Sequence, residues 1–303
     1  MKWVKRGKKS YRVLLLCALF AALMLAAPVQ AKTQTSSGKT ETKKKTYEAK
    51  WVTKKGKKYY QKKNGKYAVG GNKIDGVRYV FSEKGVLFTP KGTEIVMIKG
   101  KPYCVTTGGK AVSGWILLDN NLYYAVKKGA LLTNTTYQGI TFTKNGRAKK
   151  DAAALQKMKF MEVYQSITNP GMSQYAKLRA CWNYVTGGRL WYASKYPNLN
   201  QAGWQRATAY NMLTTRCGNC YGFACAFAAL AAEAGYHPYV VCGRVSGSRD
   251  GAADGMTRHA WVRINGCYYD PEAQYAGWMR GVYGYGYYPI SHQVQRTVDF
   301  GNY

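Results

Sequence analysis

A short unit built around glycine turns recurs five times in the first half of this 303-residue chain. In each copy a turn is followed by a short aromatic strand and then by a second turn, at Gly65, Gly85, Gly109, Gly129 and Gly146. The copies are residues 54–66, 73–86, 97–110, 117–130 and 136–148. Short strands joined by x-Gly turns predict β-hairpins. Because a lone hairpin is marginally stable, the hairpins must stack, which predicts an all-β hairpin-repeat domain (a β-solenoid) over residues 50–150.

These repeats resemble the cell-wall-binding repeats of Gram-positive surface proteins, of the choline-binding and glucan-binding type. In that family, aromatic cages between neighbouring hairpins hold a quaternary ammonium group or stack on sugars. Here Trp51 and Trp115 are the only tryptophans in the repeats, and Tyr or Phe fills most other ring positions. Two interpretations stay open. The rings bind choline or glucan, or they only pack the hairpins together.

The charge of the chain is strongly asymmetric, with 46 Lys and Arg against 14 Asp and Glu, a net charge of +32. Residues 32–150 hold 26 cations and 6 acids, whereas residues 151–303 hold 14 cations and 8 acids. Such an excess predicts binding to a polyanion, here an anionic cell-wall polymer or polysaccharide bound through the repeats. So few carboxylates also disfavour an acidic metal site or a paired-carboxylate glycosidase.

The first 31 residues are typical of a signal peptide. Six cations in residues 1–12 precede an apolar run, Val13 to Ala27, and the small-x-Ala pattern that ends at Ala31. The run is shorter than the ~20 residues that span a bilayer, so we expect membrane contact only before cleavage. Residues 32–49 are rich in Lys and Thr and predict a flexible linker. The chain is therefore expected to be secreted and associated with the cell wall, and nucleic acid is not an expected partner.

The second half contains the residue types that catalysis requires. Residues 151–166 predict an amphipathic helix, within a connecting segment at 151–171, and residues 172–185 and 204–213 predict further helices. From Cys220 to Ala234 the sequence is apolar on nearly every side, which predicts a helix buried all round. Cys220 then lies in the first turn, where the helix dipole stabilises a thiolate.

A hairpin brings a histidine and an aspartate together. Asn265-Gly266 separates two alternating apolar runs, and such a two-residue turn pairs Ile264 with Cys267. In this register Asp270 is a diagonal neighbour of His259 on the same face of the sheet. Cys220, His259 and Asp270 thus form a candidate set of nucleophile, base and orienting carboxylate.

These motifs resemble the transglutaminase-like superfamily. The matching segments are GNCYGFACAFAALAAEAGYHPYVVCG (218–243) and HAWVRINGCYYDPE (259–272), in the order Cys, His, Asp. The resemblance implies a papain-like α+β domain over residues 172–303 with a Cys220–His259–Asp270 triad. It also implies attack on a peptide or protein amide to form a thioester, which passes to water or to an amine. No cofactor or metal is expected.

Several alternatives remain beside this enzyme. A catalytically dead member of the family would serve as a wall-bound adhesion or scaffold protein. Cys217-Gly-Asn-Cys220 also permits a thiol oxidoreductase, although no βαβ pattern surrounds it. The backbone N–H of Cys220 is one candidate oxyanion donor, and Trp182 and Trp191 are candidates for the second. Cys225, His237 and His292 are expected to be structural.

Overall fold

The fold is described from a computed structural model, which covers residues 45–279 and 282–300. The signal peptide predicted at 1–31 and residues 32–44 of the predicted linker lie outside these residues. Within them, no helix is long and apolar enough to cross a membrane.

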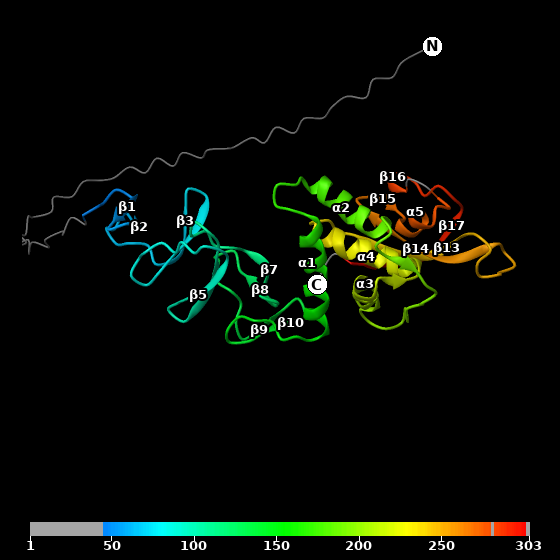
Figure 1. The fold of residues 1–303 in the computed structure, drawn as a ribbon, viewed down its shortest axis with the longest axis horizontal. Helices are drawn as coiled ribbons and strands as arrows, with labels where there is room; N and C mark the ends of the chain where they lie inside the picture. The colour runs from blue at the N-terminus through cyan, green and yellow to red at the C-terminus, as the bar shows by residue number, and fades with distance from the viewer. Residues whose placement is uncertain (1–44, 280–281, 301–303) are drawn as a thin grey trace, which may run out of the picture. The chain divides into compact units, whose positions relative to one another are not determined.

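Five antiparallel hairpins occupy residues 50–142 (Figure 1). They are β1 (Lys50–Lys54) with β2 (Lys57–Gln61), β3 (Gly70–Ile74) with β4 (Val77–Phe81), β5 (Glu94–Ile98) with β6 (Lys101–Val105), β7 (Gly114–Leu118) with β8 (Asn121–Ala125), and β9 (Thr135–Tyr137) with β10 (Ile140–Phe142). The prediction of repeated hairpins is confirmed.

Within each copy, the strands occupy other positions than those that the spacing predicted. The turn that joins the two strands is the first turn of the copy, so the first strand precedes it. Lys55 and Gly56 form this turn in the first hairpin, both with positive φ, at 47° and 73°. Two consecutive residues with positive φ match the twist of the flanking strands in a type I′ turn. The predicted second turns, such as Gly65, follow the hairpin and lead into a single bridge, for example Gln61 with Tyr67.

Backbone hydrogen bonds connect successive hairpins. In each case an N–H that follows the second turn donates to a carbonyl in the preceding hairpin. The pairs are Leu87 to Lys58, Ala111 to Arg78, Leu131 to Pro102 and Ala148 to Leu122, at 2.8, 2.9, 2.9 and 2.8 Å. This regular bonding satisfies main-chain groups that an isolated hairpin would leave unpaired.

The second half is a helical layer packed against an antiparallel sheet. Its helices are α1 (Ala152–Ile167), α2 (Gln174–Thr186), α3 (Trp204–Thr215), α4 (Cys220–Glu233) and α5 (Pro271–Ala276). The sheet has the order β16-β15-β14-β13-β17, from β13 (Tyr239–Ser246), β14 (Met256–Ile264), β15 (Cys267–Tyr269), β16 (Tyr283–Tyr285) and β17 (His292–Asp299). A short parallel pair, β11 (Trp191–Tyr192) with β12 (Cys217–Gly218), precedes α4.

Helix α4 is the centre of the main core. Every residue from Cys220 to Ala231 is buried, and the helix packs against α2, α3 and β14. Two glycines allow α3 to approach closely. A Cβ at Gly218 or Gly222 would lie 2.8 or 3.0 Å from the Met212 sulfur. The predicted all-round burial of this helix is confirmed.

Helix α1 contributes to two cores rather than presenting one amphipathic face. Ala154, Met158 and Met161 pack with residues of β8 and β10, whereas Phe160 and Val163 belong to the core around α4. Leu155, an apolar residue of the same helix, is exposed. The helix is therefore shared by the hairpins and the helical region.

Candidate active site

The first turn of α4 presents Cys220, which is fully buried. Asn219 is the N-cap of the helix, and its Oδ1 accepts a hydrogen bond from the Tyr221 N–H at 3.1 Å. The strand β12 leads directly into this cap, and its Gly218 pairs with Tyr192 of β11. The nucleophile candidate is thus held at the point where a strand turns into a buried helix.

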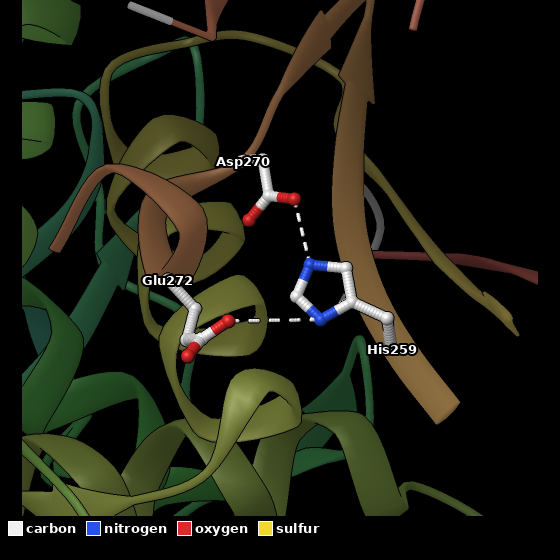
Figure 2. A group of neighbouring side chains, drawn as sticks. All are labelled: His259, Asp270 and Glu272. Atoms are coloured by element: carbon white, nitrogen blue, oxygen red, sulfur yellow. Dashed lines mark hydrogen bonds and ion pairs between the residues drawn. The ribbon is translucent and has the colours of Figure 1, made fainter. Parts of the chain in front are cut away.

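His259 lies on β14 and is 1% exposed. Its strand pairs with β15 in the register Val262–Tyr269, Arg263–Tyr268 and Ile264–Cys267. This is the predicted register, set by the Asn265-Gly266 turn, and it is confirmed. Asp270 follows directly, is 0% exposed, and faces the imidazole (Figure 2).

His259 and Asp270 form a short buried hydrogen bond. Nε2 of His259 lies 2.6 Å from Oδ2 of Asp270. The other carboxylate oxygen accepts the Ala273 N–H at 3.0 Å, which makes Asp270 the N-cap of α5. The Tyr288 hydroxyl donates a further short hydrogen bond to Oδ2. The carboxylate is therefore fixed on both oxygens.

The pKa of His259 reflects opposing influences. Burial lowers it, but the charge and hydrogen bond of Asp270, together with a hydrogen bond to the Cys220 thiol, raise it to about 10. Because Nε2 is engaged by Asp270, the nitrogen left for Cys220 is Nδ1. The arrangement favours an imidazolium, which is the charge state that pairs with a thiolate.

A second carboxylate approaches the same ring. Oε2 of Glu272 lies 3.7 Å from Nδ1 of His259, as Figure 2 shows. Glu272 is 4% exposed and accepts a hydrogen bond from Nε1 of Trp278 at 3.3 Å. Burial raises the pKa of this carboxyl, an effect that His259 partly offsets. His259, Glu272, Trp278 and Arg249 line a pocket of about 350 Å³.

The other cysteines differ from Cys220. Cys225 is buried in the core, where desolvation raises the pKa of its thiol well above the ordinary value. Cys217 lies in β12 and is half-buried. All seven cysteines in the described residues are free thiols. Cys225 therefore packs in the core, as expected.

The two tryptophans considered as oxyanion donors lie in different elements of the fold. Trp182 is buried in α2 against Phe227 and Tyr283. Trp191 is exposed on β11 and pairs through its backbone with Cys217. A different donor neighbours Cys220 in the chain. The side-chain Nδ2 of Asn219 is buried and has no hydrogen-bond partner within the described part of the chain.

The hairpin register by itself would place Glu272 opposite His259, but Pro271 was expected to end the ladder before that point, and nothing in the sequence indicated Tyr288 or Trp278. A local signal existed for Glu272. Asp270-Pro271-Glu272 combines an N-cap residue, a proline at the first helical position and an acid in the first turn, which together predict the start of α5. Tyr288 lies in the segment between β16 and β17, 18 residues from Asp270 in the chain, and no local pattern indicates their contact.

Residues 162–281 match the family model of the transglutaminase-like superfamily. This part of the chain is a transglutaminase-like domain with the α+β fold that the motifs predicted. No curated protein matches the chain.

Solved structures show a more limited similarity. Choline binding protein F from Streptococcus pneumoniae is 28% identical, over 34% of this chain and 34% of that one, with a TM-score of 0.26. The modular Cpl-1 endolysin complexed with a peptidoglycan analogue is 21% identical, over 37% of this chain and 40% of that one, with a TM-score of 0.22. The chain thus spans between a third and two fifths of the length of these structures.

Proposed function

We propose that the C-terminal domain is a cysteine enzyme that acts on amide or peptide bonds through a thioester on Cys220. The observation that carries this proposal is the buried His259, whose Nε2 lies 2.6 Å from the Asp270 carboxylate and whose pKa is raised in part by the Cys220 thiol. An imidazole held in this way has one nitrogen oriented by a carboxylate and the other available to the sulfur. That division of roles is what a thiol nucleophile requires.

The reaction follows from the positions of these groups. His259 Nδ1 takes the Cys220 proton, and the sulfur attacks the amide carbon. When the C–N bond breaks, the leaving amine takes the proton from Nδ1 and the acyl group remains as a thioester. Water or a second amine then attacks the thioester carbon, loses a proton to His259, and displaces the Cys220 thiolate. For a wall-associated enzyme we favour water as the acceptor.

The negative charge on the tetrahedral oxygen needs donors. The backbone N–H of Cys220 lies in the first turn of α4, where an N–H has no partner within the helix, and Nδ2 of Asn219 is buried without a partner among the described residues. We assign these two groups to the oxyanion. Each such donor is worth about 10²–10³ in rate in other acyl-transfer enzymes.

The hairpin repeats would hold the enzyme on anionic wall polymer. This part of the proposal is supported by the charge of residues 32–150, which hold 26 cations and only 6 acids. Secretion by the predicted signal peptide would bring the protein to such a surface.

Alkylation tests the nucleophile directly. Iodoacetamide near neutral pH should modify Cys220 much faster than the other cysteines of the described region, and the rate should drop in His259→Ala. His237→Ala is the matched control, because His237 is exposed and pairs with Asp299 away from this site. Uniform, slow labelling would support the dead scaffold protein. Loss of activity in Cys217→Ser as complete as in Cys220→Ser would support the oxidoreductase.

A further inference from the structure

A cavity of about 540 Å³ is lined by residues of α1, α2, α3 and β11. It is larger than the pocket of about 350 Å³ beside His259, and the two share no lining residue. Its volume lies within the range of roughly 300–1,000 Å³ that is usual for ligand pockets. The cavity is therefore a candidate binding site that is separate from the candidate active site.

Trp191 lines this cavity and is 49% exposed. Its backbone is held in place, because the Trp191 N–H donates to the Arg216 carbonyl at 2.9 Å and β11 pairs with β12. Successive side chains of a strand point to opposite sides, and the next residue, Tyr192, accepts a hydrogen bond from Arg249 of the pocket beside His259. The indole thus offers a broad apolar face, with one N–H at its edge, on the other side of β11.

Two arginines line the same cavity, and neither forms an ion pair within the described residues. The guanidinium of Arg189 lies over the ring of Tyr184, 5.5 Å from its centroid. Arg216 is the C-cap of α3 with a φ of 59°, in the left-handed region where glycine or asparagine is usual. Glu162, the acid in the lining, pairs with Lys159 at 3.3 Å. The two guanidinium groups therefore give the cavity an excess of positive charge.

We propose that this cavity binds an acidic saccharide. The apolar face of a sugar ring packs on the Trp191 indole, and a carboxylate or phosphate of the sugar accepts hydrogen bonds from Arg189 and Arg216. The planar guanidinium group matches both of these anions. A neutral sugar would leave the two cations unpaired, and a simple anion would leave the indole uncovered. Binding here does not depend on any reaction at Cys220, so this site goes beyond the proposed enzyme function.

Calorimetric titration of the full chain tests this site, with trigalacturonic acid and glucose 6-phosphate as acidic probes. At least one of them should bind about tenfold or more tightly than two controls, neutral maltotriose and inorganic phosphate, which has no sugar ring. Whichever acidic probe binds more tightly distinguishes a carboxylate from a phosphate as the preferred group.

Substitutions locate the binding. Arg189→Gln, Arg216→Gln and Trp191→Ala should each weaken the binding of the acidic probe by about fivefold or more, without a change in melting temperature, because all three residues are exposed. Arg263→Gln is a matched control, since Arg263 is also exposed and lies 5.1 Å from the centroid of a tyrosine ring. Trp51→Ala is the control in the repeats, where Trp51 is 40% exposed. Both controls should leave the affinity unchanged.

Three results would overturn this site. The first is that neither acidic probe binds more tightly than maltotriose, and the second is that inorganic phosphate binds as tightly as the acidic probes. The third is an unchanged affinity in the Arg189, Trp191 and Arg216 variants, or an equal loss in Trp51→Ala, which would assign the binding to another surface. Alkylation of Cys220 is measured separately, so failure of the proposed enzyme and failure of this site are distinguishable.

Discussion

The Tyr288 hydroxyl donates to Asp270 Oδ2, the same oxygen that bonds to His259. Tyr288 is buried and stacks on Trp261, with ring centroids 4.7 Å apart. It does not line the pocket that His259, Glu272, Trp278 and Arg249 form. Tyr288 is therefore a positioning residue, which restricts Asp270 to the orientation that holds the imidazole.

Tyr288→Phe should retain the stack on Trp261 and remove one hydrogen bond from a buried carboxylate. We expect the fold to persist, with a loss of about 1–3 kcal/mol in stability, and the alkylation rate of Cys220 to fall. The pH profile of alkylation should shift as well, since the carboxylate that raises the pKa of His259 loses a donor. Tyr287→Phe is the matched control, because Tyr287 is 68% exposed. An unchanged pH profile in Tyr288→Phe would exclude the positioning role.

Asp270→Asn should separate catalysis from folding. Asparagine is as good an N-cap as aspartate, so α5 should remain and the melting temperature should change little. The imidazole would lose its orienting carboxylate, and turnover should fall by up to about 10⁴-fold. Asp299→Asn, at an exposed carboxylate, should leave turnover intact. Full activity in Asp270→Asn would show that the orienting carboxylate is not needed.

Three cysteines near the start of α4 should respond differently to substitution by serine. Cys220→Ser should abolish turnover with little effect on stability. Cys225→Ser should destabilise the protein by about 1–3 kcal/mol, because it buries a hydroxyl without an assured partner. Cys217→Ser should have little effect on either. Urea unfolding and turnover of the three variants would establish which thiol reacts.

The stability of the protein should depend on the charge of His259. Its folded pKa, about 10, lies above the value near 6.5 of an unperturbed histidine. A raised pKa means that the folded state binds the proton more tightly, so the contribution is fully present below about pH 6.5. It should be lost as the pH rises toward 10. Urea unfolding between these limits should show this decline, and His259→Gln should flatten it, whereas His237→Gln should not.

Wall binding by the repeats should weaken with salt. Raising the ionic strength from about 0.1 M to about 1 M shortens the Debye length from about 10 to about 3 Å and screens exposed cations. Co-sedimentation with Gram-positive cell walls should therefore decline across this range. Replacing the exposed Lys57 and Lys58 by Gln should reduce binding more than replacing Lys195 and Arg263, which are exposed cations of the C-terminal domain. Equal losses would show that the repeats have no special part in binding.

The sequence indicated much of this site because its signals are local. The Asn265-Gly266 turn sets the pairing of β14 with β15, and that pairing brings His259 to Asp270 without any long-range information. The alanine-rich run after Cys220 similarly predicts its own burial. Contacts between distant segments have no such local signal in the sequence. The buried salt bridge between Lys157 and Glu233, at 2.6 Å, joins α1 to the end of α4, and neither residue has a neighbour in sequence that predicts the other.

In the repeats, the sequence predicted the turns correctly, but it placed the strands at other positions than the structure does. Glycines mark both turns of each copy equally well, so the spacing could not decide which turn joins the paired strands. The deciding feature is a second residue with positive φ before the glycine, such as Lys55 or Asp75. Lysine and aspartate at that position give a weaker signal than glycine does.

The sharing of α1 between two cores has a consequence for how the protein unfolds. Met158 and Met161 complete the core of the last hairpins, and Phe160 belongs to the core around Cys220. Melting of α1 would uncover apolar surface in both regions at once, so the last hairpins and the transglutaminase-like domain should lose structure in a single cooperative transition. Proteolytic cleavage near residue 150 would then release no independent enzyme. It would leave a fragment whose exposed methionines favour aggregation.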